Sequence, residues 1–351
     1  MGKKFMYITF VVFVLSIFFV AQGHAKKQKV YKLVGAHFTI PKHRCMVIMH
    51  KWQEKVEADS GGRIKFANHY AGDLVSKKEQ LDALGKGIID FVCSVPVYFS
   101  GKVGIADIVL MPTNFNSWQG LYDVLHRTDV YDIINKAYQK KTNTMLISFL
   151  PIFSSENFLI SKKAKKIKKF EDFKGMKIRA AGGIASETVK SIGATPVVLL
   201  STELYTGFQQ GIVDGGLLTM YSLQTYKLWE VCSQNIWPSV FPYCTAAIWM
   251  NPEKLNSLPK DLQKIVLDAA RSPELEKWAI EYIKEHDRGI EKTAKEKYNI
   301  DFFTLPEAEV TKMEKALVPV WDKYIANCEK QGLGEQARQI EKIVHKHYFS
   351  K

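Results

Sequence analysis

The chain has 351 residues, of which 46% are hydrophobic and 24% are charged, and its formal net charge at pH 7 is +13. This composition is typical of a globular protein, and the length is enough for two domains. The excess of lysine would suit nucleic acid, but no zinc-finger spacing or other nucleic-acid motif accompanies it, so we expect no nucleic-acid partner. The one dense run, residues 162–169, is interpreted as a solvated loop that attracts anions.

Residues 1–25 have the three parts of a secretory signal peptide. Lys3 and Lys4 form a basic start, residues 8–20 are almost wholly apolar, and small residues precede a cleavage point after Ala25. We therefore expect a soluble mature protein in the periplasm. The alternative is an uncleaved anchor, because the apolar segment approaches the ~18 residues at which a membrane-spanning helix becomes credible.

The first part of the mature chain alternates strands and helices. Strands are predicted at residues 30–36, 63–70 and 88–95, and helices at residues 41–58 and 76–87. The first helix has a core-facing stripe formed by Met46, Met49, Trp52 and Val56. This order predicts a parallel sheet whose strands point their carboxyl ends toward one edge. Two further helices, around residues 121–125 and 130–137, precede a strand at residues 144–150.

Residues 170–214 have the spacing of an α/β unit. The predicted elements are a strand at 176–180, a helix at 184–192, a strand at 195–199 and a helix that is capped by Ser201 or Thr202 and ends at Gly211. Arg179 lies at the carboxyl end of the first strand, where open α/β sheets hold ligands. Its planar fork fits a carboxylate, although a surface arginine paired with a nearby acid remains the alternative.

Four motifs in this half carry a family resemblance. EDFKGMKIR, GATPV, ELYTGFQQGIVDG and KLWEV resemble the periplasmic substrate-binding proteins of TRAP transporters, the tripartite ATP-independent uptake systems for organic acids, and weaker similarity extends from about Tyr31 to about Trp321. The resemblance implies a DctP-like receptor that closes two α/β domains on a small carboxylate and delivers it to a membrane permease. It also implies that Arg179 grips the carboxylate.

The sequence departs from the family at two positions near the implied ligand site. A second arginine that many relatives have is missing close to Glu156, and Leu218 replaces a common asparagine. We therefore predict a compact monocarboxylate with an apolar or aromatic remainder, because a second carboxylate would lack a partner.

Four more residues are candidates for the wall of the site. Tyr98, Tyr221 and Tyr243 are expected to supply aromatic surface and hydroxyl groups, unless they are ordinary half-buried tyrosines. His37 ends the first strand and is expected either to line the pocket or to make a hydrogen bond in a turn. The nine histidines are dispersed, so we predict no metal and no other cofactor.

The remaining chain is predicted to return to the first domain and then end in helices. A strand is expected at 245–250, a helix from Asn251-Pro252, helices at 262–270 and 275–290, a strand at 301–304, and helices at 307–330 and 335–347 that pack on the second domain. Ser272-Pro273 should kink the long helical region or restart it with Ser272 as the cap. The predicted limits are 30–150 with 245–285 for domain I, and 151–244 with 286–351 for domain II.

The five cysteines form no CxxC pair and are mostly interpreted as small buried residues, although Cys232 and Cys244 are close enough in sequence for a disulfide. The preferred function is a monomeric, non-enzymatic receptor for an organic acid. The alternatives are a secreted hydrolase or other enzyme on a similar fold, and a basic protein that binds acidic polymers.

Overall fold

The computed structural model describes residues 28–112, 118–237, 240–241 and 243–349. The predicted leader, residues 1–25, lies outside these residues. In the described part, no helix has the length and apolarity needed to cross a membrane.

The first strands and helices follow the predicted order. β1 (Tyr31–Ala36) pairs in parallel with both β2 (Ile64–His69) and β3 (Phe91–Ser94). The connecting helices are α2 (Arg44–Asp59) and α3 (Gln80–Gly85). The predicted apolar stripe of α2 is fully buried. This helix begins three residues after Pro41 because His43 is its N-cap and accepts a hydrogen bond from the Cys45 backbone N–H.

The next four helices pack over the central strands of the sheet. They are η1 (Pro96–Phe99), η2 (Gly104–Leu110), α4 (Trp118–Arg127) and α5 (Val130–Thr142). The amphipathic runs that predicted α4 and α5 bury their apolar residues, as expected.

β4 (Met145–Ser161) is the longest strand and joins the two parts of the sheet. Its first part pairs with β9 (Tyr243–Met250), and its last part pairs with β7 (Gly215–Thr219) and β8 (Cys232–Trp237). The prediction ended this strand at residue 150, before Pro151. The strand continues because new partners take over: it pairs with β9 up to Ser155, with an irregular register between Pro151 and Ser155, and with β7 and β8 after it.

The strands and helices predicted for 170–214 are confirmed. They are β5 (Lys177–Ala180), α6 (Gly183–Ser191), β6 (Thr195–Val198) and α7 (Leu204–Gln210), with short turns of helix at η3 (Phe170–Phe173) and η4 (Ser201–Glu203). The predicted cap is not confirmed, because Ser201 and Thr202 lie inside η4, and α7 follows Glu203 without a side-chain cap. Gly211 ends α7 with φ of 77°, a conformation that costs glycine little. Two further short helices follow β7, namely α8 (Ser222–Thr225) and η5 (Leu228–Glu230).

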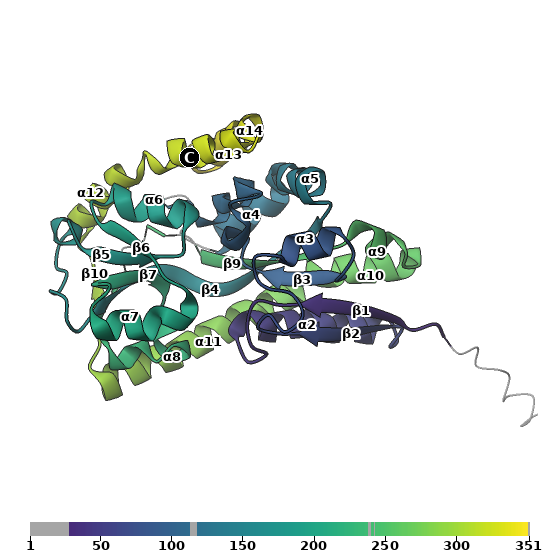
Figure 1. Ribbon diagram of the computed structural model, residues 1–351, viewed down its shortest axis with the longest axis horizontal. Helices are drawn as coiled ribbons and strands as arrows, with labels where there is room; N and C mark the ends of the chain where they lie inside the picture. The colour runs from purple at the N-terminus through teal and green to yellow at the C-terminus, as the bar shows by residue number, and fades with distance from the viewer. Residues whose placement is uncertain (1–27, 113–117, 238–239, 242, 350–351) are drawn as a thin grey trace, which may run out of the picture.

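The strands form one twisted, mixed sheet in the order β2-β1-β3-β9-β4-β7-β5-β6, and β8 joins β4 to β10 (Asp301–Thr304). Helices lie on both faces of the sheet (Figure 1). The predicted α/β class is therefore correct. The carboxyl ends of β1 and β3 in one part, and of β5 in the other, lie on either side of the crossing strands β4 and β9.

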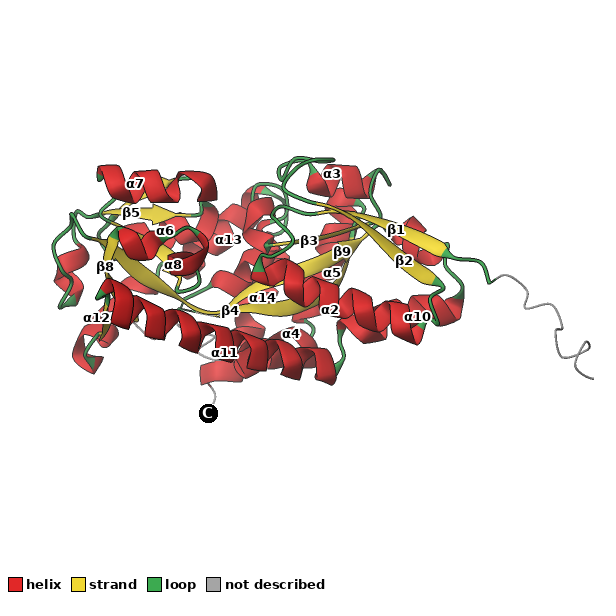
Figure 2. Ribbon diagram, turned by 90° about the horizontal axis from the view of Figure 1, so that it is seen from below, coloured by secondary structure: helices red, strands yellow, loops and turns green. Residues whose placement is uncertain are grey.

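A long helix runs along the sheet from one part to the other. After α9 (Pro252–Asn256) and α10 (Lys260–Ala270), the chain restarts as α11 (Pro273–Tyr298), which contacts α2, β4 and α8. The predicted cap is confirmed, since the Ser272 side chain accepts a hydrogen bond from the Leu275 backbone N–H at 3.1 Å. Figure 2 shows α11 below the sheet.

The C-terminal helices are α12 (Glu307–Leu317), α13 (Val320–Lys330) and α14 (Gly334–Phe349). α12 packs on η3 and α6, α13 packs on both α6 and η2, and α14 packs on α4 and α5. The prediction that all of them pack on the second domain therefore holds for α12, holds in part for α13, and is wrong for α14. The chain returns toward the first part because α13 and α14 pack against each other and α14 buries its apolar face there.

Candidate functional site

Two cavities lie on opposite faces of the sheet where β4 crosses from one part to the other. Successive residues of a strand point to opposite faces, and Glu156 lines one cavity whereas Ser155 and Asn157 line the other. We name them by the feature that defines each: the Arg179 cavity and the α11 cavity.

The Arg179 cavity has a volume of about 90 Å³. Its walls come from the ends of β1, β3, β5 and β7 and from the turns that follow them. The lining residues are Phe38, His43, Val95, Val97, Tyr98, Leu110, Glu156, Arg179, Ala181, Ala185, Ser201, Leu204, Leu218, Thr219, Tyr221, Ser222 and Tyr226. Most of these side chains are apolar or aromatic, and Arg179 and Glu156 are the charged ones.

Arg179 is held at the carboxyl end of β5, as predicted from its position. Only 7% of the residue is exposed, and its Nε and Nη2 atoms both donate to the Leu199 carbonyl at 3.3 Å. In the described residues no carboxylate lies within 4.0 Å of its guanidinium. Gly216 of β7 provides the space, because a Cβ there would meet the Arg179 Cβ at 3.4 Å and Leu218 Cδ1 at 2.9 Å. Arginine keeps its charge at neutral pH even where burial lowers its pKa.

Glu156 projects into the same cavity from β4 and is half-buried. Burial raises the pKa of its carboxyl to about 7, and the nearby Arg179 guanidinium opposes this by lowering the pKa. Within the described part of the chain its carboxyl has no hydrogen-bond donor or ion-pair partner. A carboxyl in this state titrates near neutral pH and has unused hydrogen-bonding capacity.

His43 and Tyr221 form one wall and support each other. Their rings meet edge to face with centres 5.4 Å apart, and the Tyr221 hydroxyl accepts a hydrogen bond from the Arg44 backbone N–H. The Arg44 guanidinium lies 4.3 Å from the centre of the Tyr221 ring and pairs with Asp287 at 2.6 Å. Burial, together with Arg44, lowers the pKa of His43 to about 4, so this histidine is neutral at neutral pH.

Phe38 and Tyr98 continue this wall, because the Phe38 ring centre lies 5.7 Å from that of His43 and 5.4 Å from that of Tyr98. The Lys77 ammonium lies 3.8 Å from the centre of the Tyr98 ring. Burial lowers the pKa of Lys77, and the Arg179 charge lowers it further. Lys77 and Arg179 therefore place two positive charges near Tyr98, which favours the approach of an anion.

The structure brings four of the six predicted site residues together: Arg179, Tyr98, Leu218 and Tyr221 line one cavity. His37 does not line it. Its neighbour Phe38 lines the cavity, but the His37 ring is fully buried in the core. There, Nε2 is bonded to Asn68 Oδ1 at 3.0 Å and Nδ1 accepts a hydrogen bond from the Cys93 backbone N–H. Tyr243 belongs to β9, but its side chain lies outside the described residues.

Sequence reasoning missed His43, Phe38 and Tyr226 as lining residues. The signal for the first two was available, because they follow the end of β1 and precede α2, the loop in which ligands are held in such sheets. Tyr226 follows α8, a short helix that no sequence pattern indicated.

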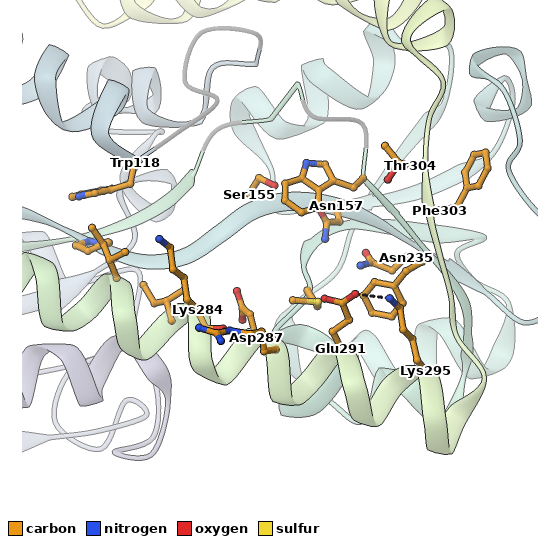
Figure 3. A pocket seen from close by; sticks show the side chains of 17 residues that line it. Trp118, Ser155, Asn157, Asn235, Lys284, Asp287, Glu291, Lys295, Phe303 and Thr304 are labelled. Atoms are coloured by element: carbon orange, nitrogen blue, oxygen red, sulfur yellow. Dashed lines mark hydrogen bonds and ion pairs between the residues drawn. The ribbon is translucent and has the colours of Figure 1, made fainter.

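The α11 cavity is larger, at about 450 Å³. It lies between α11 and strands β4, β8 and β10, and Figure 3 shows Lys284 and Asp287 on the helix facing Asn157 and Asn235 on the strands. The two asparagines are buried, and each has an amide oxygen without a hydrogen-bond partner in the described residues.

The charged groups of the α11 cavity are already paired or lie in solvent. Asp287 is bonded to Arg44, and Glu291 is paired with Lys295 at 2.5 Å (Figure 3). Lys284 and Arg288 are exposed on α11. Over the described residues, no group of three or more metal-ligating side chains is found in either cavity.

Comparison with known proteins identifies a family. The model of the family described as "Bacterial extracellular solute-binding protein, family 7", DctP, matches residues 36–327. The ectoine-binding periplasmic protein TeaA of Halomonas elongata is 26% identical over 77% of this chain and 76% of that protein. The C4-dicarboxylate-binding periplasmic protein DctP of Rhodobacter capsulatus is 25% identical over 78% of this chain and 80% of that protein.

The fold is shared with solved structures. A TRAP periplasmic solute-binding protein from Desulfovibrio salexigens with bound orotic acid superposes with a TM-score of 0.80 and 21% identity, covering 91% of this chain and 99% of that one. The predicted two-domain fold of periplasmic binding proteins, with its long helical region, is thereby confirmed.

Proposed function

The chain belongs to family 7 of the bacterial extracellular solute-binding proteins, and on this premise we propose that it is a periplasmic receptor of a TRAP transporter, binding one small organic acid in the Arg179 cavity and delivering it to the membrane permease. The predicted resemblance to DctP-like receptors is confirmed by the family match. Export through removal of residues 1–25 is part of the proposal.

One observation carries the proposal: a buried guanidinium lines a cavity and pairs with no acid of the described chain. Removing a cation from water is costly unless an anion or several hydrogen-bond acceptors replace the solvent. Arg179 uses two donor nitrogens on one carbonyl. A ligand carboxylate would supply the negative charge that Arg179 does not receive from the described protein, and it would bind in the bidentate geometry that arginine favours.

We further propose that the ligand carries a single carboxylate. Arg179 is the cation among the lining residues, His43 is neutral at neutral pH, and the position near which many relatives have a second arginine holds Glu156. A second ligand carboxylate would face another acid rather than a cation. Leu218, Tyr98 and Tyr221 would instead pack on an apolar remainder, at ~25 cal/mol for each Å² buried.

Two relatives are named for binding ectoine and C4-dicarboxylates, and a structural neighbour holds orotic acid. These ligands support a receptor for small organic solutes. The names do not select one of these ligands. The proposal of a monocarboxylate depends on the charges that line this cavity.

An enzymatic alternative finds less support in the site. A hydrolytic triad needs a histidine whose Nδ1–H is oriented by a carboxylate. The Nδ1 atom of His43 instead accepts a hydrogen bond from the Cys45 backbone N–H at 3.2 Å. We therefore propose binding without turnover.

We also propose that the receptor is a monomer that closes on its ligand by a hinge. The predicted boundaries at 150/151, 244/245 and 285/286 fall in β4, β9 and α11, the three segments that cross between the parts of the sheet. Bending these segments would close the Arg179 cavity, which takes walls from both sides. Small-angle scattering should then show a smaller radius of gyration with ligand than without it.

A ligand screen tests the function. Native mass spectrometry of the exported protein should reveal a retained small acid, and thermal shifts should be measured with branched and aromatic monocarboxylates, succinate, malate and galacturonate. A ligand at a hundred times its dissociation constant should add ~2.7 kcal/mol to the stability. Largest shifts with succinate or malate would overturn the single carboxylate, and a largest shift with galacturonate would overturn the apolar remainder, but either result would keep the receptor. No retained molecule and no shift with any acid would overturn the receptor itself.

A further inference from the structure

The Arg179 cavity contains an acid as well as a base, and neither has an ionic partner in the described residues. Glu156 and Arg179 line the same 90 Å³ cavity, yet their charged groups are more than 4.0 Å apart and form no ion pair. They are close enough to affect each other electrostatically. Two groups of opposite charge, neither with an ionic partner in the described residues, therefore line the same cavity.

The register of the strands explains why the two groups stay apart. Glu156 of β4 pairs with Thr219 of β7, and Arg179 of β5 pairs with Gly216 of β7. One whole strand, β7, separates their backbones. Its Leu218 and Thr219 form the surface between the two charges.

We propose that the ligand is a zwitterion, with a carboxylate that binds Arg179, a protonated nitrogen that binds Glu156, and a compact apolar body that lies over Leu218. This inference rests on the proposed receptor function and names the ligand class of the same site. An ammonium group would donate hydrogen bonds to a carboxylate that has none from the described protein. Cyclic and branched amino acids, and imino acids such as proline, belong to this class.

The other groups around the cavity leave Glu156 as the anionic contact. Arg179 and Lys77 are cations, His43 is neutral, and Tyr98, Tyr221 and Tyr226 contribute aromatic rings and hydroxyl groups. A ligand cation placed anywhere else on this wall would meet a like charge or a neutral dipole. Glu156 is thus the residue whose carboxyl sets the preference for a zwitterion over a plain carboxylate.

Matched probes test the proposal by calorimetry at pH 8. Each pair keeps the carboxylate and replaces the charged nitrogen by carbon or hydrogen: L-proline with cyclopentanecarboxylate, L-pipecolate with cyclohexanecarboxylate, and L-valine with 3-methylbutanoate. The best zwitterion should bind at least about tenfold more tightly than its partner, because a hydrogen bond to a charged group is lost in the partner.

Two variants assign the preference to one carboxyl. Glu156→Gln keeps the shape and removes the charge, so the preference for the zwitterion should fall to about threefold or less. Glu291→Gln makes the same change in the α11 cavity and should leave the preference unchanged. A wild-type protein that binds the deaminated acids better, or a preference that survives Glu156→Gln, would overturn the inference.

The outcomes separate this inference from the receptor function. Tight binding of the deaminated acids that is lost in Arg179→Gln would keep the receptor and discard the zwitterion. Absence of binding by both series would also discard the zwitterion, and the receptor would then stand or fall with the retained molecule and the screen of other acids.

A second, independent observation concerns two thiols in the core. Cys45 lies in the first turn of α2 and Cys93 lies in β3, 48 residues further along the chain, and both are fully buried. Their sulfur atoms are 3.4 Å apart. Cys232 and Cys328 are buried elsewhere, and in the described residues neither meets another cysteine.

We infer that Cys45 and Cys93 form a disulfide when the chain is exported. The two thiols lose two electrons and two protons to a dithiol-disulfide oxidant of the periplasm, which is reduced to its dithiol. Small movements about the side-chain torsions bring the sulfur atoms to the ~2.05 Å of a disulfide. Oxidation must precede the packing of α2 on β3, because the folded core hides both thiols.

Mass spectrometry of protein purified from the periplasm tests this pairing. Denatured, unreduced protein should be about 2 Da lighter than reduced protein, and a proteolytic digest should contain a peptide that links Cys45 to Cys93. Cys45→Ser should lose the linked peptide, whereas Cys232→Ser should retain it. Alkylation of Cys45 and Cys93 in denaturant without reductant, or a link between other cysteines, would overturn the inference.

Discussion

The Arg179 cavity and the α11 cavity use opposite faces of the same strands, but they treat charge differently. The α11 cavity is about five times larger, at about 450 Å³ against about 90 Å³. Its acids are paired, and its free-standing cations lie in solvent. In the smaller cavity, Arg179 is buried and Glu156 is half-buried, and neither has an ionic partner in the described part of the chain.

This difference shows why size alone would select the wrong cavity for the receptor function. An enclosed charge without a partner costs free energy that packing elsewhere must offset, so such a group points to a ligand that restores the lost interactions. The buried amides Asn157 and Asn235 of the α11 cavity are neutral, and an unpartnered amide oxygen costs far less than an unpartnered ion. The comparison therefore predicts that variants in the two cavities change different properties.

The largest effect should come from Asp287→Ala in the α11 cavity, and it should be an effect on stability. Asp287 pairs with Arg44, which is fully buried, so removing the acid leaves a buried cation without its carboxylate. Breaking a buried ion pair in this way costs about 3–5 kcal/mol. Urea unfolding followed by fluorescence measures the loss.

Glu291→Ala is the control for this prediction. Glu291 lines the same cavity, but its ion pair with Lys295 is half-exposed, and such pairs contribute about 0–1 kcal/mol. A loss for Asp287→Ala no greater than that for Glu291→Ala would contradict the assignment of Asp287 to the fold.

The next largest effect is expected for Arg179→Lys and concerns affinity. Lysine keeps the charge but cannot bind a carboxylate with two parallel N–H groups, and loss of this fork should cost about 2–3 kcal/mol, or about a hundredfold in affinity. Calorimetry with the tightest acid from the screen measures it. The matched variant Arg288→Lys, on the exposed side of the α11 cavity, should bind that acid like the wild type. Unchanged affinity of a folded Arg179→Lys protein would remove Arg179 from the site.

Much of the fold that positions Arg179 could be predicted from local sequence. The turns of β5, α6 and α7 are marked by glycines that adopt positive φ, including Gly193 and Gly211, and these residues act within a few positions of the turn they make. Ser272 caps α11 and Pro273 begins it, as the serine hydroxyl followed by a proline predicted. Signals of this kind are local, so a single sequence contains them.

The rest depended on partners that are distant in the sequence. β4 runs past Pro151 because β7 and β8 replace β9 beside it, and no local pattern shows that exchange. The sequence indicated that an arginine is missing near Glu156, but not that the Glu156 carboxyl itself lines the cavity. His37 was a candidate because it ends β1, yet Asn68 and the Cys93 backbone hold its ring in the core.

The pH dependence of affinity should further distinguish the Arg179 cavity, with a change in affinity of about tenfold. The Glu156 carboxyl, with a pKa of about 7, is mostly protonated at pH 6 before a ligand binds. A zwitterion needs the ionised form, so its binding at pH 6 should release a proton, and its affinity should rise about tenfold from pH 6 to pH 8. Calorimetry in buffers of different ionisation enthalpy measures the proton release.

The sign of this effect separates the ligand classes. A plain monocarboxylate would favour the protonated Glu156, so its binding should take up a proton and weaken as the pH rises. Glu156→Gln should make the affinity independent of pH over this range. The unliganded protein should also lose stability from pH ~4.3 to pH 7, because the raised pKa of Glu156 means that the folded state binds more protons than the unfolded state there.

The smallest effect is expected for Lys284→Ala, and it tests the comparison from the other side. Lys284 is an exposed cation of the α11 cavity, and Figure 3 shows it rising from α11 toward the crossing strand. If the α11 cavity were the site for an organic acid, removal of this amine would weaken binding by the tenfold or more that a charge-assisted hydrogen bond contributes. Because the acid is expected on the other face of the sheet, beside Arg179, the affinity should stay within about twofold, since physiological salt screens an exposed charge such as that of Lys284. Calorimetry at 0.15 M salt with the acid used for Arg179→Lys makes the two variants directly comparable. A loss in Lys284→Ala as large as that in Arg179→Lys would transfer the ligand to the α11 cavity, and would show that volume rather than buried charge marks the site in this protein.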